Sequence, residues 1–222
     1  MSAAGLLDIA YFVGLQLRTL DIFRYVSCHE KNFSTYSIII ESALVDSGSF
    51  FDSLCRTFIR TKSSTGYHFT QESKVPHLAD KIIGNSNFNF GDYRVLLEVD
   101  FTLSGRQVNL NPYEDMFYRN PISYAPGDIS GYLLTPFREW ASGGASPWWD
   151  AFTSLKHDRL KNFRQATLGT VIHTLAAVFI ILTLSNEPYF KEGHVSPEIY
   201  ILFFPKYWKW KGRVMPGNFT WL

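Results

Sequence analysis

The longest uncharged run of the chain, residues 168–184, limits the choice of fold more than any other feature. It holds 17 residues, most of them Leu, Ile, Val, Ala or Thr, and none carries a formal charge. A helix that is apolar on all sides lies either in a protein core or in a bilayer. The run is at the short end of the roughly 17 to 25 residues that span a membrane, and it contains His173 and several threonines. We therefore expect a core helix, and a single-pass membrane protein is a less favoured alternative.

The stretch just before this run predicts a shorter helix and then a charged junction. Ser146 is a typical N-cap residue, and Pro147 suits the first helical position. Trp148, Trp149, Phe152 and Leu155 then fall on one face, where we expect core anchors rather than stacking platforms. The charged break at 156–159 separates this helix, 147–155, from a core helix over about 160–185 that Asn186 and Pro188 end.

The remaining pattern is mostly helical, with one β-like region. Helical spacing of apolar residues predicts helices over 3–18, 36–60 and 70–84, with a short extended piece between 19 and 32 and a polar loop at 61–69. Val95, Leu97, Val99, Phe101 and Leu103 alternate, and Ser104-Gly105 is a turn signal, which predicts a β-hairpin returning through 108–110. Prolines, glycines and aromatic residues over 112–146 predict a long ordered loop. A further strand is expected at 199–204.

Composition favours one domain and excludes several classes of protein. The 222 residues can form a single domain, with an insertion at about 88–145 and a C-terminal tail at about 188–222. A net charge of +1 gives no overall nucleic-acid signature. Cys28 and Cys55 have neither disulfide-framework nor zinc-ligand spacing, and Asp8 interrupts what would otherwise resemble a signal peptide. We therefore expect a cytoplasmic protein without a metal or another cofactor.

The charged junction is the candidate functional site. Lys156, His157, Arg159, Lys161 and Arg164 fall within nine residues, where two helices meet. Imidazole, ammonium and guanidinium groups beside free backbone N–H groups can bind a phosphate. On a continuous helix His173 would lie roughly 160° around and ~24 Å along the axis from His157, so it is excluded from this site.

Structural explanations for the same residues stay open. His157, Asp158 and Arg159 can simply cap two helices and form a salt-bridge cluster, and we weigh this slightly above a ligand or catalytic role. Asp158 and Glu41 are candidates to face the junction and hold its basic side chains in place through their carboxylates. The tail segment KYWKWKGR combines basic and aromatic residues that can bind single-stranded nucleic acid, but an amphipathic strand explains the pattern better.

Three segments taken together have the pattern of a known family. WWDAFTSLKHDR is followed by FRQATLGTVIHTLAAVF and is preceded, earlier in the chain, by a long helix that ends in SFFDSLCRTFIR. This combination resembles the HEPN superfamily of small helical-bundle proteins, above all over residues 36–60 and 146–184. The resemblance implies a mainly α, HEPN-like helical bundle with the β-hairpin and the aromatic loop inserted.

The resemblance also implies a function. Many HEPN proteins are metal-independent ribonucleases that act as homodimers, with an Arg and a His separated by four to six residues in a composite site. His157 matches that His, but the positions where the Arg would fall are Phe152, Ala151 and Asp150. Arg159 or Arg164 would have to replace it, with His157 as general acid or base on the ribose hydroxyl.

These observations lead to one expected function and one rival. We expect an RNA-binding protein, or a ribonuclease with a degenerate site; the resemblance to HEPN proteins implies a prokaryotic stress, toxin–antitoxin or defence setting. His157 and Arg159 would be its catalytic residues, and Lys156, Lys161 and Arg164 would bind the phosphate. The rival is a non-catalytic protein that uses the same bundle to dimerise or to dock a partner.

Overall fold

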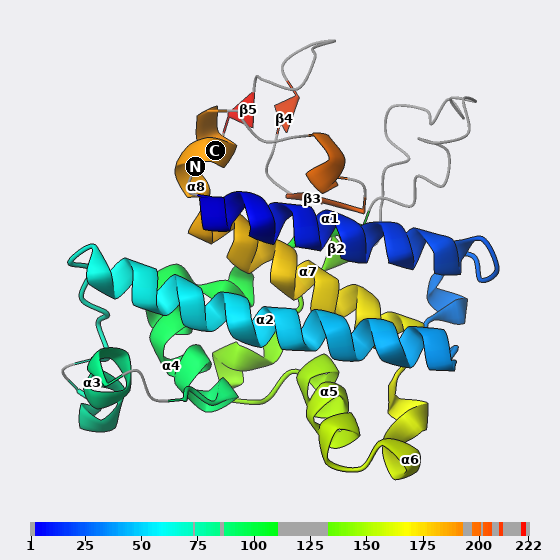
Figure 1. Cartoon of the computed structure of the whole chain (residues 1–222), viewed down its shortest axis with the longest axis horizontal. Helices are drawn as coiled ribbons and strands as arrows, with labels where there is room; N and C mark the ends of the chain where they lie inside the picture. The colour runs from blue at the N-terminus through cyan, green and yellow to red at the C-terminus, as the bar shows by residue number, and fades with distance from the viewer. Residues whose placement is uncertain are drawn as a thin grey trace.

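The chain folds into a mainly helical structure (Figure 1). The structure is a computed structural model, and it describes residues 3–72, 74–84, 87–110, 133–192, 197–200, 202–205, 209–210 and 219–220. The helices in these ranges are α1 Ala3–Phe23, α2 Ile38–Ser64, α3 Pro76–Ile83, α4 Phe90–Phe101, α5 Pro147–His157, α6 Arg159–Asn162, α7 Leu168–Ser185 and α8 Glu187–Glu192. The strands are β1 Val108–Leu110, β2 Leu133–Leu134, β3 Phe203–Pro205, β4 Lys209–Trp210 and β5 Phe219–Thr220.

Helix α7 is the core of the fold, as the uncharged run predicts. It contacts α1, α2 and α5, and Figure 1 shows it crossing between α1 and α2. Every residue from Thr174 to Leu184 is buried. By length and composition α7 is able to cross a membrane, but 83% of it is buried inside the protein. The apolar run is thus accounted for by contacts within the chain.

A small sheet lies against α1 and is held there by a buried glutamine. β1 is the central strand and pairs antiparallel with both β2 and β3. Gln16 of α1 is fully buried, and its side chain donates to the Ile199 carbonyl at 3.2 Å and accepts from the Leu202 N–H at 3.0 Å. Because the side-chain amide satisfies two backbone groups, the segment leading into β3 is fixed to α1.

Aromatic side chains join α2, α4 and α5. The Trp148 ring lies edge-on to Phe51 at 4.9 Å, and the Trp149 ring stacks on Phe90 at 4.5 Å. Trp148 is 2% exposed, and its indole N–H donates to the Pro136 carbonyl at 2.8 Å. The expectation that Trp148 is a core anchor is therefore confirmed.

The predicted β-hairpin is wrong for its first strand. Residues 90–101 form helix α4, whose start is fixed by a capping box between Asn89 and Asp92. Tyr93, Leu96 and Leu97 are buried, a spacing of three and four residues that belongs to a helix. Alternating apolar residues obscured this period, while the capping pair Asn89 and Asp92 was a signal for the helix. Only 108–110 forms a strand, as β1.

Other element boundaries also need correction. α1 runs through to Phe23, so the extended piece expected between 19 and 32 is wrong, and α2 runs to Ser64 through part of the expected polar loop. The helix expected over 160–185 is two helices, α6 and α7. The expected strand 199–204 begins only at Phe203 in β3, after a 3-10 turn at Pro197–Tyr200.

Parts of the expected loop and tail lie outside the described residues. These parts are residues 111–132 of the loop and residues 193–196, 201, 206–208, 211–218 and 221–222 of the tail. In the described part of the tail, β4 pairs antiparallel with β5.

Gly48 allows α5 to approach α2 closely, which leads to a first prediction. A Cβ placed there would lie 2.5 Å from the ring of the fully buried Phe152. Overpacking costs about 1–3 kcal/mol, whereas replacing a helical Gly by Ala gains about 1 kcal/mol. We expect Gly48→Ala to lower the free energy of unfolding in urea. Gly14→Ala, at an exposed position of α1 where the new Cβ would meet nothing within 4 Å, should leave the free energy of unfolding unchanged or raise it. Equal effects of the two substitutions would contradict the close packing of Phe152 on Gly48.

Tyr93 gives a prediction for alkaline pH. Its hydroxyl donates to Asp52 Oδ1 at 2.7 Å. Burial, and then this hydrogen bond and the Asp52 charge, raise the pKa of Tyr93 above its usual 10.0. The folded state therefore keeps a proton that the unfolded state loses, so stability falls as pH rises past 10.0, by up to about 1.4 kcal/mol per pH unit.

Tyr93→Phe removes the titrating hydroxyl. Its free energy of unfolding should therefore decline less steeply between neutral and alkaline pH than that of the wild type, as measured by urea titration. Parallel declines would show that Tyr93 does not contribute.

Candidate functional site

The charged junction is a sharp turn between two helices and is capped by its own aspartate. α5 ends at His157, and the Asp158 N–H donates to the Ser154 carbonyl at 3.0 Å. The Asp158 carboxylate accepts from the Lys161 N–H at 3.1 Å, so it also caps the start of α6. The capping explanation weighed from the sequence therefore describes Asp158 correctly.

Arg159 is held by a carboxylate from a distant part of the chain. Glu41, in the first turn of α2, is 1% exposed and lies against the Arg159 side chain, which is 63% exposed. The guanidinium Nη2 donates to Glu41 Oε2 at 2.7 Å, and Nε forms an ion pair with Oε1. This hydrogen bond, and then the Glu41 charge, raise the pKa of Arg159. Glu41 thus reaches the junction, and its carboxylate pairs with two nitrogens of the predicted catalytic arginine, one of them through a hydrogen bond.

Four basic side chains remain at the junction, and we refer to Lys156, His157, Lys161 and Arg164 as the basic corner. All four are exposed. The Lys156 ammonium lies 5.1 Å from the centre of the Phe152 ring. His157, Lys161 and Arg164 have no side-chain hydrogen bond or ion pair to any described residue. The basic corner therefore offers exposed basic groups that form no hydrogen bond or ion pair with the described part of the fold.

Exposed apolar side chains occur on both segments that meet at the Glu41–Arg159 pair. Ile38 and Ile39 on α2 are 70% and 60% exposed, and Leu160 on α6 is 94% exposed. The two segments touch, because the Tyr36 and Phe163 rings meet edge-on at 5.6 Å. Ile38, Ile39 and Leu160 are called the apolar rim below.

The start of α7 is satisfied by the protein itself. The Leu168 N–H donates to the Thr35 carbonyl at 2.8 Å and the Gly169 N–H to the Phe33 carbonyl at 2.9 Å. Thr167 and Thr170 complete a capping box. A Cβ on Gly169 would lie 3.1 Å from the Phe33 Cβ, so glycine permits this approach. The free N–H groups of a helix start, which would bind an anion, are thus already used here.

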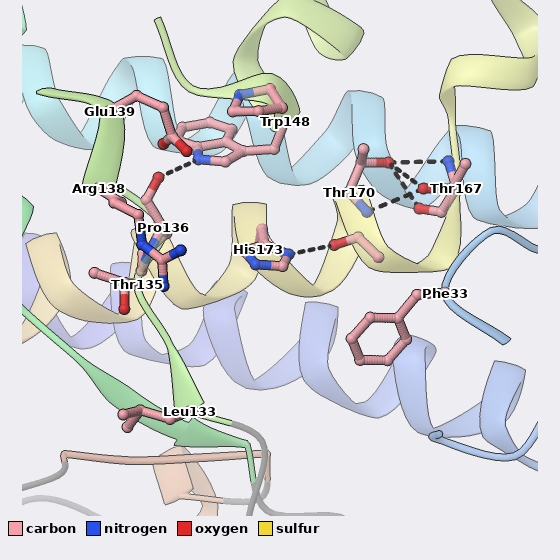
Figure 2. Close-up of a pocket in the computed structure, with 12 residues that line it drawn as sticks. Phe33, Leu133, Thr135, Pro136, Arg138, Glu139, Trp148, Thr167, Thr170 and His173 are labelled. Atoms are coloured by element: carbon pink, nitrogen blue, oxygen red, sulfur yellow. Dashed lines mark hydrogen bonds between the residues drawn. The ribbon is translucent and has the colours of Figure 1, made fainter. Parts of the chain in front are cut away.

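A pocket lies beside this part of α7, between α7 and the segment that follows β2 (Figure 2). Its volume is about 370 Å³. Its apolar wall includes Phe33 and Trp148, and its polar wall includes Arg138, Glu139 and His173. His173 thus belongs to a different region from His157, as the helical geometry predicts. The pocket itself was not foreseen, because Arg138 and Glu139 fall in the stretch expected to be a loop.

Several polar groups of the pocket already have hydrogen-bond partners within the protein. Thr167 and Thr170 serve the capping box, and the Trp148 N–H serves Pro136. His173 Nδ1 lies 2.9 Å from the Gly169 carbonyl. A carbonyl only accepts, so Nδ1 carries the hydrogen and Nε2 of the neutral ring presents a lone pair.

Metal binding is not supported in the part of the chain that the structure describes. No group of three or more His, Cys, Asp or Glu side chains there can hold a metal ion. The described histidines and Cys28 and Cys55 provide no such site.

Comparisons with known protein families, with curated proteins and with solved structures find no match to this chain.

The Glu41–Arg159 pair gives a prediction about stability. Arg159→Ala leaves a buried carboxylate without its partner, which is costly. We expect this variant to unfold at lower urea concentration than the wild type. Adding Glu41→Gln removes the buried charge and should recover part of the loss. Arg164→Ala, an exposed neighbour without a described partner, is the matched control and should unfold like the wild type. Additive effects of the two changes at 41 and 159 would rule out the coupling.

Proposed function

We propose that this protein binds RNA through the basic corner. The observation that supports the proposal is that Glu41 pairs with Arg159, while Lys156, His157, Lys161 and Arg164 stay exposed and form no ion pair with a described residue. Exposed basic side chains bind the phosphate backbone by charge and by release of counterions. They carry no information about base sequence, so the binding we propose is not sequence-specific.

Binding fits the corner better than cleavage does. A metal-independent ribonuclease of the expected type needs His157 to move a proton and an arginine to hold the phosphate. Two donors of Arg159 face Glu41, and Phe152, Ala151 and Asp150 stand where the family's arginine would be. Arg164 is the other arginine in the sequence of the junction. Cleavage would therefore depend on a second copy of the chain that brings its own basic corner to the same RNA.

A second candidate function is self-association or docking of a partner protein. It is supported by the apolar rim, because large apolar side chains exposed on two segments that touch are typical of interaction surfaces. A homodimer formed through Ile38, Ile39 and Leu160 would also bring two basic corners towards each other. In either case we propose a cytoplasmic location. RNA is available there, and the apolar helix α7 is buried in the core of the fold.

RNA binding is tested by fluorescence polarisation with a labelled single-stranded RNA at several salt concentrations. We expect the wild type to bind more weakly as salt rises, and the triple variant Lys156→Gln, Lys161→Gln, Arg164→Gln to lose most affinity. Each phosphate contact contributes about 0.7 to the slope of log affinity against log salt. The variant's slope should therefore be shallower by up to about 2.

The control is Lys74→Gln, at an exposed lysine outside the basic corner, and it should bind like the wild type. No binding by the wild type, or equal binding by the triple variant, would contradict the proposal. A wild type that fails to bind RNA but has twice the chain mass in light scattering would favour the self-association function. Incubation of RNA with the wild type and with His157→Ala separates cleavage from binding. If the protein is a ribonuclease, the wild type should produce RNA fragments and His157→Ala should not.

A further inference from the structure

We propose that the pocket between α7 and the β2–α5 segment is a binding site for a small zwitterion, a molecule with a carboxylate and an ammonium group on an apolar body. This site is separate from the basic corner and does not depend on RNA binding. Its volume of about 370 Å³ is near the lower end of the ~300–1,000 Å³ found for small-molecule sites.

The charges of the pocket determine the class of ligand. Arg138 and Glu139 both line it, and neither side chain has an ion pair or hydrogen bond to a described residue. Figure 2 shows the Arg138 guanidinium extending towards His173 and the Glu139 side chain pointing in the direction of Trp148. Opposite charges in one pocket disfavour a polyphosphate, which Glu139 would repel. A zwitterion satisfies both, with its carboxylate on Arg138 and its ammonium on Glu139.

His173 adds a third polar contact. Its Nδ1–H is held by the Gly169 carbonyl at 2.9 Å, so Nε2 of the neutral ring is an acceptor. In Figure 2 this second nitrogen lies on the side of the ring that faces Arg138. An acceptor at this point favours a ligand that also donates, as an ammonium group does. This complements Arg138, which only donates.

The apolar wall accounts for the body of the ligand. The Trp148 indole N–H donates to the Pro136 carbonyl, and its ring packs against Phe51. The side of the pocket that Trp148 forms is therefore held in place. Phe33 is held across the pocket by the hydrogen bond of its carbonyl to Gly169. Preformed apolar walls with a few unused polar groups are the usual composition of a small-molecule site.

The test uses isothermal titration calorimetry on the full chain with L-leucine, L-methionine and L-phenylalanine. For each amino acid that binds, the matched acid without the amine and the matched amine without the carboxylate are titrated as well. We expect at least one amino acid to bind, and both of its analogues to bind about 10-fold more weakly or less, since a charged hydrogen bond contributes about 1.5–3 kcal/mol. The proposal would be overturned if none of the three amino acids bound at about 10 mM. At that concentration even a binding free energy of only ~3 kcal/mol would be detected.

Two variants assign the charges. Arg138→Gln loses the partner of the ligand carboxylate, so it should bind the amino acid about as weakly as the wild type binds the amine. Glu139→Gln loses the partner of the ammonium group, so it should bind the amino acid about as weakly as the wild type binds the acid. Both positions are at least partly exposed, so we expect both variants to fold, and thermal melts by circular dichroism check this. Lys74→Gln is the control and should bind like the wild type. Wild-type affinity in both variants would overturn the assignment.

Discussion

Burial of α7 is the constraint on which the rest of the structure depends. The helix is apolar on almost every side, so α1, α2 and α5 must all contact it to remove its surface from water. Its first turn is fixed to the segment before α2 by the hydrogen bonds of Leu168 and Gly169. These contacts place the start of α2 beside the α5–α6 turn, and this is where Glu41 meets Arg159. The basic corner and the pocket both follow from the way α7 is enclosed.

The Glu41–Arg159 pair changes the interpretation of the junction. From the sequence, Arg159 is predicted to be the catalytic partner of His157, with Arg164 as the alternative. In the structure its guanidinium anchors the α6 turn to α2. An arginine that is held by a buried carboxylate is poorly suited to clamp a phosphate, whereas Lys156, Lys161 and Arg164 remain exposed. We therefore favour binding over catalysis as the function of the corner.

The sequence was most informative where one signal dominated. The uncharged run predicted the core helix, Ser146-Pro147 predicted the start of α5, and the tryptophans predicted an aromatic core. It was least informative where two patterns overlapped. Val95 to Leu103 alternates like a strand, yet the buried face is that of a helix capped by Asn89 and Asp92. The contact of Glu41 with Arg159 and the pocket around His173 depend on packing between segments far apart in the chain, and local spacing does not contain that information.

We propose two separate surfaces, an exposed basic corner that binds RNA and a pocket beside α7 that binds a small zwitterion. Hydrogen–deuterium exchange of the full chain, with and without single-stranded RNA, tests this separation most directly. The account predicts slower exchange on RNA binding at residues 156–165, with residues 133–140 and 168–174 unchanged. Protection confined to the pocket residues, or no protection anywhere, would contradict it.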